Sequence, residues 1–138
     1  MSQAIHIAHI SFQDTWPIRH QVMWPDQPLD FIKLAKDEEG LHYGLYLNHK
    51  LISVVSAFID GEVAQFRKFA TLEKYQGKGW GSQLLEFVLD DLRRQHMTRI
   101  WCNARVEKLK LYERFGLVET ALRFDQRGRE YVVMEWVK

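Results

Sequence analysis

Residues 75–82 read YQGKGWGS, and glycine occupies positions 77, 79 and 81 of this stretch. The whole chain has only 8 glycines among its 138 residues, so the stretch is a local concentration. Glycine adopts backbone dihedral angles that other residues avoid, and a ligand can approach its main chain because no Cβ stands in the way. The stretch therefore predicts either a tight turn or a site where the main chain binds a ligand.

The glycines stand between a predicted strand and a predicted helix. Residues 63–72 (VAQFRKFATL) read as a strand, whereas the apolar side chains of residues 84–92 recur at helical spacing and predict a helix over 79–95. The first amides of a helix lack intrahelical partners and carry partial positive charge, so they attract phosphate. This position favours an anion site, above all for a pyrophosphate, with a ligand-free turn as the alternative. Two other phosphate motifs, the P-loop and the dinucleotide fingerprint, do not match the glycine spacing.

Strand signals dominate the chain before the glycines. Residues 42–47, 51–59 and 63–72 form an antiparallel meander in this interpretation, with a strong hairpin signal at Asp60-Gly61. Nearer the N-terminus, residues 4–12 read as a strand. A short helix over 15–22 follows, with Asp14 as its expected N-cap. Residues 29–40 have no clear period and are expected to be irregular.

The region after the long helix supplies the remaining elements. A strand over 99–104 precedes a helix over 107–115, which Gly116 is well placed to end, and two strands follow. A long helix joins strands 63–72 and 99–104, so these two strands should be parallel with a right-handed crossover. We expect a single α/β domain over residues 1–138, with a mixed, mostly antiparallel central sheet flanked by helices.

Composition narrows the classes of function. The formal net charge of +1 gives no nucleic-acid footprint, and no apolar run is long enough to span a membrane. A single cysteine, Cys102, and six scattered histidines give no metal-ligand spacing. We expect a cytoplasmic protein without a metal, a nucleic-acid partner or a membrane partner.

The segment from Gln76 to Gly81 resembles the Q/R-x-x-G-x-G/A signature of the GNAT superfamily of N-acetyltransferases. The surrounding FRKFATLEKYQGKGWGSQLLEFVL and the later WCNARVEKLKLYERFGL are similar to other parts of that family, so the resemblance is strongest over residues 63–118. RHQVMWPDQPL resembles a subset of small bacterial members. The resemblance implies the GNAT acyl-CoA N-acyltransferase fold, in which strands 63–72 and 99–104 splay apart, and an acyltransferase that uses acetyl-CoA.

The resemblance also implies which residues bind acetyl-CoA. The diphosphate should lie on the main chain of the signature loop, and the pantetheine arm should pair with the preceding strand like an added strand. Asn103 would contact the pantetheine or the helix that follows, although a purely structural role is an alternative, as it is for Lys78 and Trp80. For the diphosphate, the resemblance implies Gln76, Gly77, Lys78, Gly79, Trp80, Gly81 and Ser82. For the pantetheine arm, it implies Phe69, Ala70 and Thr71.

Tyr112 occupies the position of the family's tyrosine, within LYERFG. A phenol with a pKa near 10 can protonate the CoA thiolate that leaves, so the resemblance implies a general acid. The alternative is an ordinary core stripe with Leu109 and Phe115. The base stays open between Glu62, Glu135, a water molecule and a backbone carbonyl.

These observations predict an acetyl-CoA-dependent N-acetyltransferase that moves an acetyl group directly to a primary amine. A non-catalytic acyl-CoA sensor of the same fold and an acyltransferase for a longer acyl group are the alternatives. The acceptor would be a small molecule or a peptide, and a homodimer is compatible with this reading. We expect the segment RHQVMWPDQPLDFIK to form the rim of the acceptor site. Acidic side chains in and just after it could attract a cationic amine or form a solvated loop: Asp26, Asp30, Asp37, Glu38 and Glu39.

Overall fold

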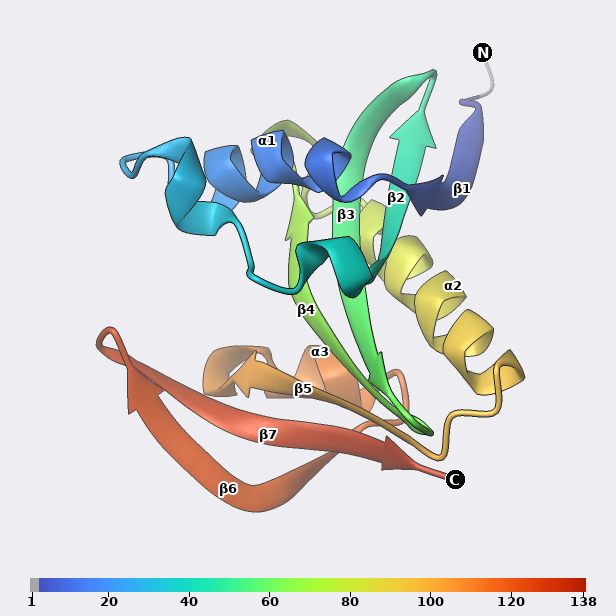
Figure 1. Ribbon diagram of the computed structural model, residues 1–138, viewed down its shortest axis with the longest axis vertical. Helices are drawn as coiled ribbons and strands as arrows, with labels where there is room; N and C mark the ends of the chain where they lie inside the picture. The colour runs from blue at the N-terminus through green and yellow to red at the C-terminus, as the bar shows by residue number, and fades with distance from the viewer. Residues whose placement is uncertain (1–2) are drawn as a thin grey trace.

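The computed structural model describes residues 3–138 and shows a seven-stranded sheet with helices on both faces (Figure 1). The order of helices and strands along the chain is the predicted one. The elements are β1 (Ile5–Ile10), α1 (Phe12–Met23), β2 (Leu41–Leu47), β3 (Lys50–Asp60), β4 (Val63–Thr71), α2 (Trp80–Arg94), β5 (Arg99–Arg105), α3 (Leu109–Glu113), β6 (Val118–Gln126) and β7 (Arg129–Val137).

The strands are arranged in the order β1-β2-β3-β4-β5-β7-β6. β4 and β5 are parallel, and all other neighbours are antiparallel, which confirms the mixed, mostly antiparallel sheet. The β4–β5 pairing covers only Val63–Gln65 and Arg99–Trp101, and the two strands then diverge (Figure 1). The splayed strands implied by the GNAT resemblance are therefore confirmed.

Helices α1 and α2 both contact β2, β3 and β4, and they cover opposite faces of the sheet. The predicted apolar face of α2 is buried in full, at Leu84, Leu85, Val88, Leu89 and Leu92. Burial of each such side chain contributes about 1.5–3 kcal/mol to folding. The buried cysteine Cys102 packs in the same core. The helix that carries the glycine loop is thus firmly fixed to the sheet.

The predicted start of the first helix is wrong by three residues. Ser11, not Asp14, is the N-cap: its backbone is extended, and its hydroxyl accepts a hydrogen bond from the Asp14 amide at 3.3 Å. Asp14 instead lies in the first helical turn, where its carboxylate interacts favourably with the helix dipole. Both residue types are good caps, and only the chain direction entering from β1 decides between them.

Helix α3 is shorter than predicted, because a 3₁₀ turn (Val106–Lys108) forms its first part. Its end matches the prediction, since Gly116 has a φ of 89° and follows the last turn. The Gly116 amide donates to the Glu113 carbonyl at 3.0 Å, and the Leu117 amide donates to the Tyr112 carbonyl at 3.3 Å. This pair of hydrogen bonds is the Schellman arrangement, and it fixes the helix that carries Tyr112.

Residues 24–40 contain no long helix, as predicted, and form two short 3₁₀ turns, Leu29–Ile32 and Asp37–Glu39. Among residues 3–138, no helix is long and apolar enough to cross a membrane.

Candidate functional site

A bulge in β4 opens the fork between β4 and β5. Ser56 of β3 pairs with Arg67, and Val54 pairs with Ala70, so Lys68 and Phe69 together stand opposite one residue of β3. Lys68 has a φ of 57°, a left-handed conformation that is uncommon for a residue with a side chain. Such a bulge bends its strand. β4 pairs with β5 only as far as Gln65, three residues before Lys68, and beyond that point the two strands leave an opening within the sheet.

The signature loop lies at the open end of this fork. The side-chain amide of Gln76 donates to the Thr71 carbonyl at 2.8 Å, which ties the loop to the end of β4. The predicted arm residues Phe69, Ala70 and Thr71 lie on the part of β4 that has left β5. The structure thus brings the two predicted groups of CoA-binding residues together.

The amides at the start of α2 have no side-chain cap. Gly79 is the N-cap, with a φ of 89°, and no side chain accepts from the helix amides there. A Cβ added at Gly79 would meet nothing within 4 Å, so this glycine is needed for its conformation. A Cβ at Gly81 would lie 2.9 Å from Thr71 Oγ1 and 3.1 Å from Phe69 Cζ, so that glycine is needed for close packing on β4. Together they form a main-chain cradle that suits a diphosphate.

The other predicted residues of the loop and of β5 take up mixed positions. Lys78 and Asn103 are exposed, and Trp80 packs partly against the hydrophobic core. Asn103 alternates with buried Cys102 and Ala104, so its side chain points to the opposite face from theirs. Ser82 is half-buried in the first turn of α2.

Tyr112 lies on the α2 face of the fork. Its ring centroid is 5.9 Å from that of Phe66, which lies on β4 just past the end of the pairing with β5. Burial, reinforced by the neighbouring Cys102, raises the pKa of Tyr112 above the ordinary value of 10. The phenol is therefore protonated at neutral pH. Among residues 3–138 its hydroxyl has no hydrogen-bond partner, so it is free to donate to a ligand in the fork.

The two candidate bases lie at the closed end of the fork. Glu62 directly precedes the paired part of β4, and its carbonyl accepts the Thr98 amide at 2.7 Å. Glu135 on β7 faces Trp101, and its carboxylate accepts from Arg99 at 2.7 Å. Glu62 is six strand residues from Lys68, or about 20 Å along β4. The structure does not bring either carboxylate to the bulge.

A buried ion pair that the sequence did not reveal lies on the α1 face of the sheet. Arg19 and Asp37 form a two-pronged contact with N···O distances of 2.9 and 3.0 Å, and their side chains are 0% and 4% exposed. Asp37 also accepts from the Trp16 indole at 3.0 Å and from the Leu34 amide at 2.9 Å. These donors, with Arg19, hold the pKa of Asp37 below its usual value despite burial. Asp37 is thus a structural residue and is not available to attract an amine.

Ser56 and His42 extend the same network. The Ser56 hydroxyl accepts from Arg19 at 2.9 Å and lies 2.7 Å from His42 Nδ1. The Asp37 carbonyl can only accept, so His42 Nε2 carries a hydrogen and donates to it at 2.7 Å. Burial lowers the pKa of His42, so the imidazole is neutral at neutral pH and Nδ1 accepts from the Ser56 hydroxyl. Only the fold could reveal the network, because its members come from four separate elements.

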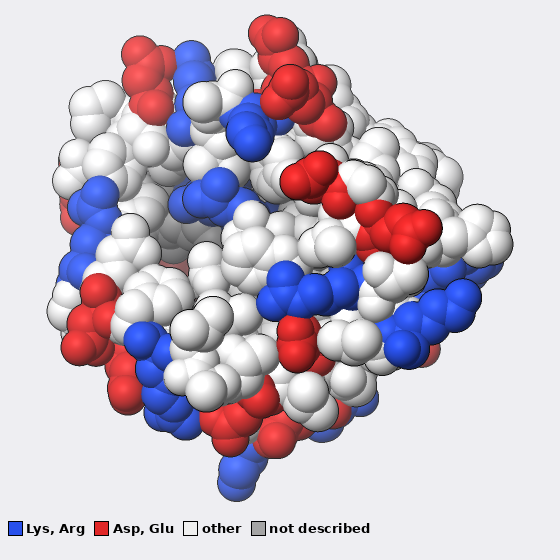
Figure 2. Space-filling model, turned by 60° about the horizontal axis from the view of Figure 1, so that its bottom comes forward, with Lys and Arg blue, Asp and Glu red and all other residues white. Residues whose placement is uncertain are grey.

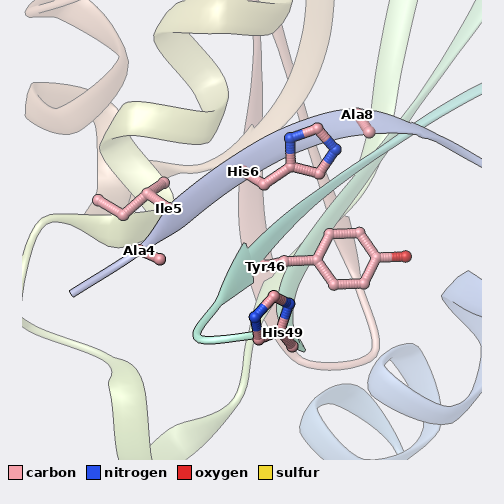
Figure 3. A pocket seen from close by; sticks show the side chains of 6 residues that line it. All are labelled: Ala4, Ile5, His6, Ala8, Tyr46 and His49. Carbon is pink, nitrogen blue, oxygen red and sulfur yellow. The ribbon is translucent and has the colours of Figure 1, made fainter.

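Two hollows lie outside the fork. One, of about 460 Å³, lies at the β1 edge between side chains of β1 and of the β2–β3 hairpin, including His6, Tyr46 and His49 (Figure 3). The other lies beside the end of β4 and is lined by Gln21, Lys50 and residues 72–75. Within residues 3–138, no group of three or more His, Cys, Asp or Glu side chains is placed to hold a metal ion.

A forked mixed sheet with a glycine-capped helix at its opening defines the class of acyl-CoA N-acyltransferases. Residues 3–117 match the acetyltransferase (GNAT) family, and the chain belongs to this family.

Similar proteins agree with this assignment. An uncharacterized N-acetyltransferase, YitI, of Bacillus subtilis (strain 168) is 29% identical over 133 residues, covering 90% of this chain and 89% of that protein. The crystal structure of a putative N-acetyltransferase from Lactobacillus plantarum superimposes with a TM-score of 0.85 at 23% identity, covering 96% of this chain and 97% of that one. The ribosomal-protein-S18-alanine N-acetyltransferase from Escherichia coli gives a TM-score of 0.83 at 19% identity, covering 97% and 94%. The chain is thus an acyltransferase of the N-acetyltransferase type.

Proposed function

We propose that the protein transfers an acetyl group from acetyl-CoA directly to a primary amine of a small molecule or a peptide. The observation that carries this proposal is the start of α2, whose uncapped amides open onto the fork between β4 and β5. A structural neighbour from Elizabethkingia anophelis, a GNAT family acetyltransferase, has acetyl-CoA bound, which supports the choice of donor.

The main chain from Gln76 to Ser82 would hold the diphosphate, since it offers free amides at a helix N-terminus. The main chain from Phe69 to Thr71 would pair with the pantetheine arm in place of β5. Asn103, exposed on β5, would contact the arm from the other side of the fork. The thioester would then lie near the bulge, where β4 leaves β5.

At the thioester, the amine nitrogen attacks the carbonyl carbon and the carbon–sulfur bond breaks. Acetyl-CoA supplies the activated acetyl group, and the amine loses a proton to water. Tyr112 donates its hydroxyl proton to the departing thiolate, and the phenolate then recovers a proton from solvent. Burial raises the pKa of Tyr112, so its hydroxyl carries a proton at neutral pH.

A Tyr112→Phe variant tests the acid role. The variant keeps the ring that packs near Phe66, so acetyl-CoA should still raise the melting temperature as it does in the wild type. Turnover with a responsive amine should fall by about 100-fold or more, the usual contribution of a general acid. Unchanged turnover would remove Tyr112 from the chemistry.

The position of the two candidate bases motivates a second function, an acyl-CoA sensor without catalysis. Glu62 and Glu135 lie at the closed end of the fork, so neither carboxylate is placed to accept a proton from the amine. A sensor would be stabilised by acetyl-CoA yet release no free thiol with any primary amine in a broad panel. Thermal shifts with acetyl-, propionyl- and succinyl-CoA would show in the same experiment whether a longer acyl group is preferred.

A further inference from the structure

We propose that the acceptor amine carries a carboxylate, as an α-amino acid does, and that Arg67, Lys68 and Arg127 bind this carboxylate. The inference rests on the proposed function, because it assigns the acceptor side of the same site.

Arg67 and Lys68 lie at the bulge where the fork opens. Arg67 stands opposite Ser56, and paired residues of neighbouring strands point to the same face of a sheet. Ser56 binds Arg19 and His42 on the α1 face, so Arg67 points to that face as well. Tyr112 approaches from the α2 face. An acceptor on the α1 face would therefore meet the thioester from the side opposite to the proposed acid.

Arg127 reaches the same region from the turn between β6 and β7. Its guanidinium carbon lies 5.0 Å from the ring centroids of both Trp24 and Phe31, which follow α1. The two rings are 5.2 Å apart in an edge-to-face contact. The C-terminal hairpin thus contacts the segment after α1 through Arg127, whose charge also acts on Lys68 at the bulge.

Arg67 and Arg127 are exposed and Lys68 is half-buried. Among residues 3–138, these three cations form no ion pair or side-chain hydrogen bond of the kind that Arg19, Arg93 and Arg99 make. The nearby carboxylate of Asp37 already accepts two hydrogen bonds from Arg19. Burial and the positive charges of Arg67, Arg19 and Arg127 lower the pKa of Lys68, and the negative charge of Asp37 offsets only part of this change. An anion placed there would relieve this repulsion.

The character of the site favours a carboxylate on a partly apolar acceptor. Arginine binds a carboxylate with two parallel hydrogen bonds, and Arg127 is pre-oriented by its aromatic neighbours. Phe31, which Arg127 contacts, is 38% exposed, and Leu29, two residues earlier in the chain, is 42% exposed. On the molecular surface, a hollow on the left of the view has Lys or Arg atoms on its rim (Figure 2). A polycationic amine would be repelled by this group of side chains.

The test compares amino acids with their uncharged counterparts in a thiol-release assay. L-phenylalanine, L-phenylalaninamide and phenethylamine share one side chain, and alanine and glutamate with their α-amides cover other sizes. The acid should exceed its amide by about tenfold or more in kcat/KM, chiefly through KM. The amide has the larger fraction of free amine at neutral pH, so basicity cannot explain this preference. Arg127→Gln and Lys68→Gln should each remove most of it, whereas the exposed Arg94→Gln on α2 should retain it.

Two results would overturn the inference: equal use of acid and amide by the wild type, or weaker acetyl-CoA binding in both variants, which would assign the cations to the donor. A failure of the proposed function looks different. In that case acetyl-CoA raises the melting temperature, but no amine releases thiol. Calorimetry with N-acetylphenylalanine and its amide in the presence of CoA then decides, since binding of the acid alone supports the carboxylate site and equal or absent binding rejects it.

Discussion

Arg19 and Asp37 show how a single pair of charged residues can hold an otherwise irregular segment in place. Residues 24–40 contain only short 3₁₀ turns, yet the Asp37 carboxylate collects four hydrogen bonds, including one from the indole of Trp16. The pair fixes this segment against α1 and β3. The aromatic residues that contact Arg127 belong to the same segment, so the pair supports the acceptor side of the site.

Asp37→Asn should reduce the free energy of unfolding by about 3–5 kcal/mol, because it leaves the buried Arg19 charge uncompensated. Urea denaturation monitored by tryptophan fluorescence measures the change. The matched control is Asp30→Asn, which removes an exposed carboxylate paired with Lys33 at 2.7 Å and should change nothing measurable. Similar effects of the two substitutions would contradict the structural role of Asp37.

The sequence could not reveal this pair, for a physical reason. Asp37 stands in the run DEEG, where each carboxylate has the same local signature, and the partner Arg19 is 18 positions away. Nothing in periodicity or composition selects one acid among several for burial. The glycines at 77, 79 and 81 could be interpreted from the sequence, because glycine itself signals a left-handed cap or a close contact, here with β4.

At the level of elements, the strongly patterned segments were predictable and the irregularities were not. The buried stripe of α2 follows directly from its leucine spacing, and Gly116 marks the end of α3 because only a left-handed residue suits that place. The start of α1 was missed because two good caps, Ser11 and Asp14, compete within three residues. The bulge at Lys68 left no trace in the sequence, since lysine is no signal for a positive φ.

The bulge carries backbone strain that can be measured. Lys68→Gly and Lys68→Gln both remove the charge, but only glycine adopts the left-handed conformation without cost. Lys68→Gly should therefore be about 0.5–1 kcal/mol more stable than Lys68→Gln, after allowing for the greater entropy of glycine in the unfolded chain. Thermal unfolding at one pH compares the two. Equal stability, or a less stable glycine variant, would show that the backbone at this position is not strained.

At the scale of the whole molecule, the network of Arg19, Asp37, Ser56 and His42 joins four elements on the α1 face of the sheet. It connects α1, the 3₁₀ turn at Asp37, β2 and β3 through hydrogen bonds of 2.7–3.0 Å. Protonation of His42 Nδ1 would end its role as acceptor and place a second buried positive charge near Arg19, which destabilises this network. The protonation of His42 thus affects how firmly α1 and the 3₁₀ turn are held on the sheet.

Stability should therefore fall as the pH drops below 6.5, the ordinary pKa of histidine. The folded state lowers the pKa of His42, so between the folded and unfolded values the unfolded chain binds the extra proton. Stability is complete above pH 6.5 and is lost as the pH falls through the lower, folded value. The free energy of unfolding measured from pH 8 to 5 should show this slope, and His42→Gln should be flatter over the same range. A wild-type profile that is no steeper than that of the variant would contradict the assignment.

The short seam between β4 and β5 has a mechanical consequence. β4 and β5 pair only through Val63–Gln65 and Arg99–Trp101, but one hydrophobic core continues from one half of the sheet to the other, for example where Phe66 packs near Tyr112. The contact of Arg127 with Trp24 and Phe31 is of a kind that contributes about 0.5–2 kcal/mol, a small addition to that core. The two halves of the sheet therefore depend on shared side-chain packing, rather than on main-chain pairing, to stay together.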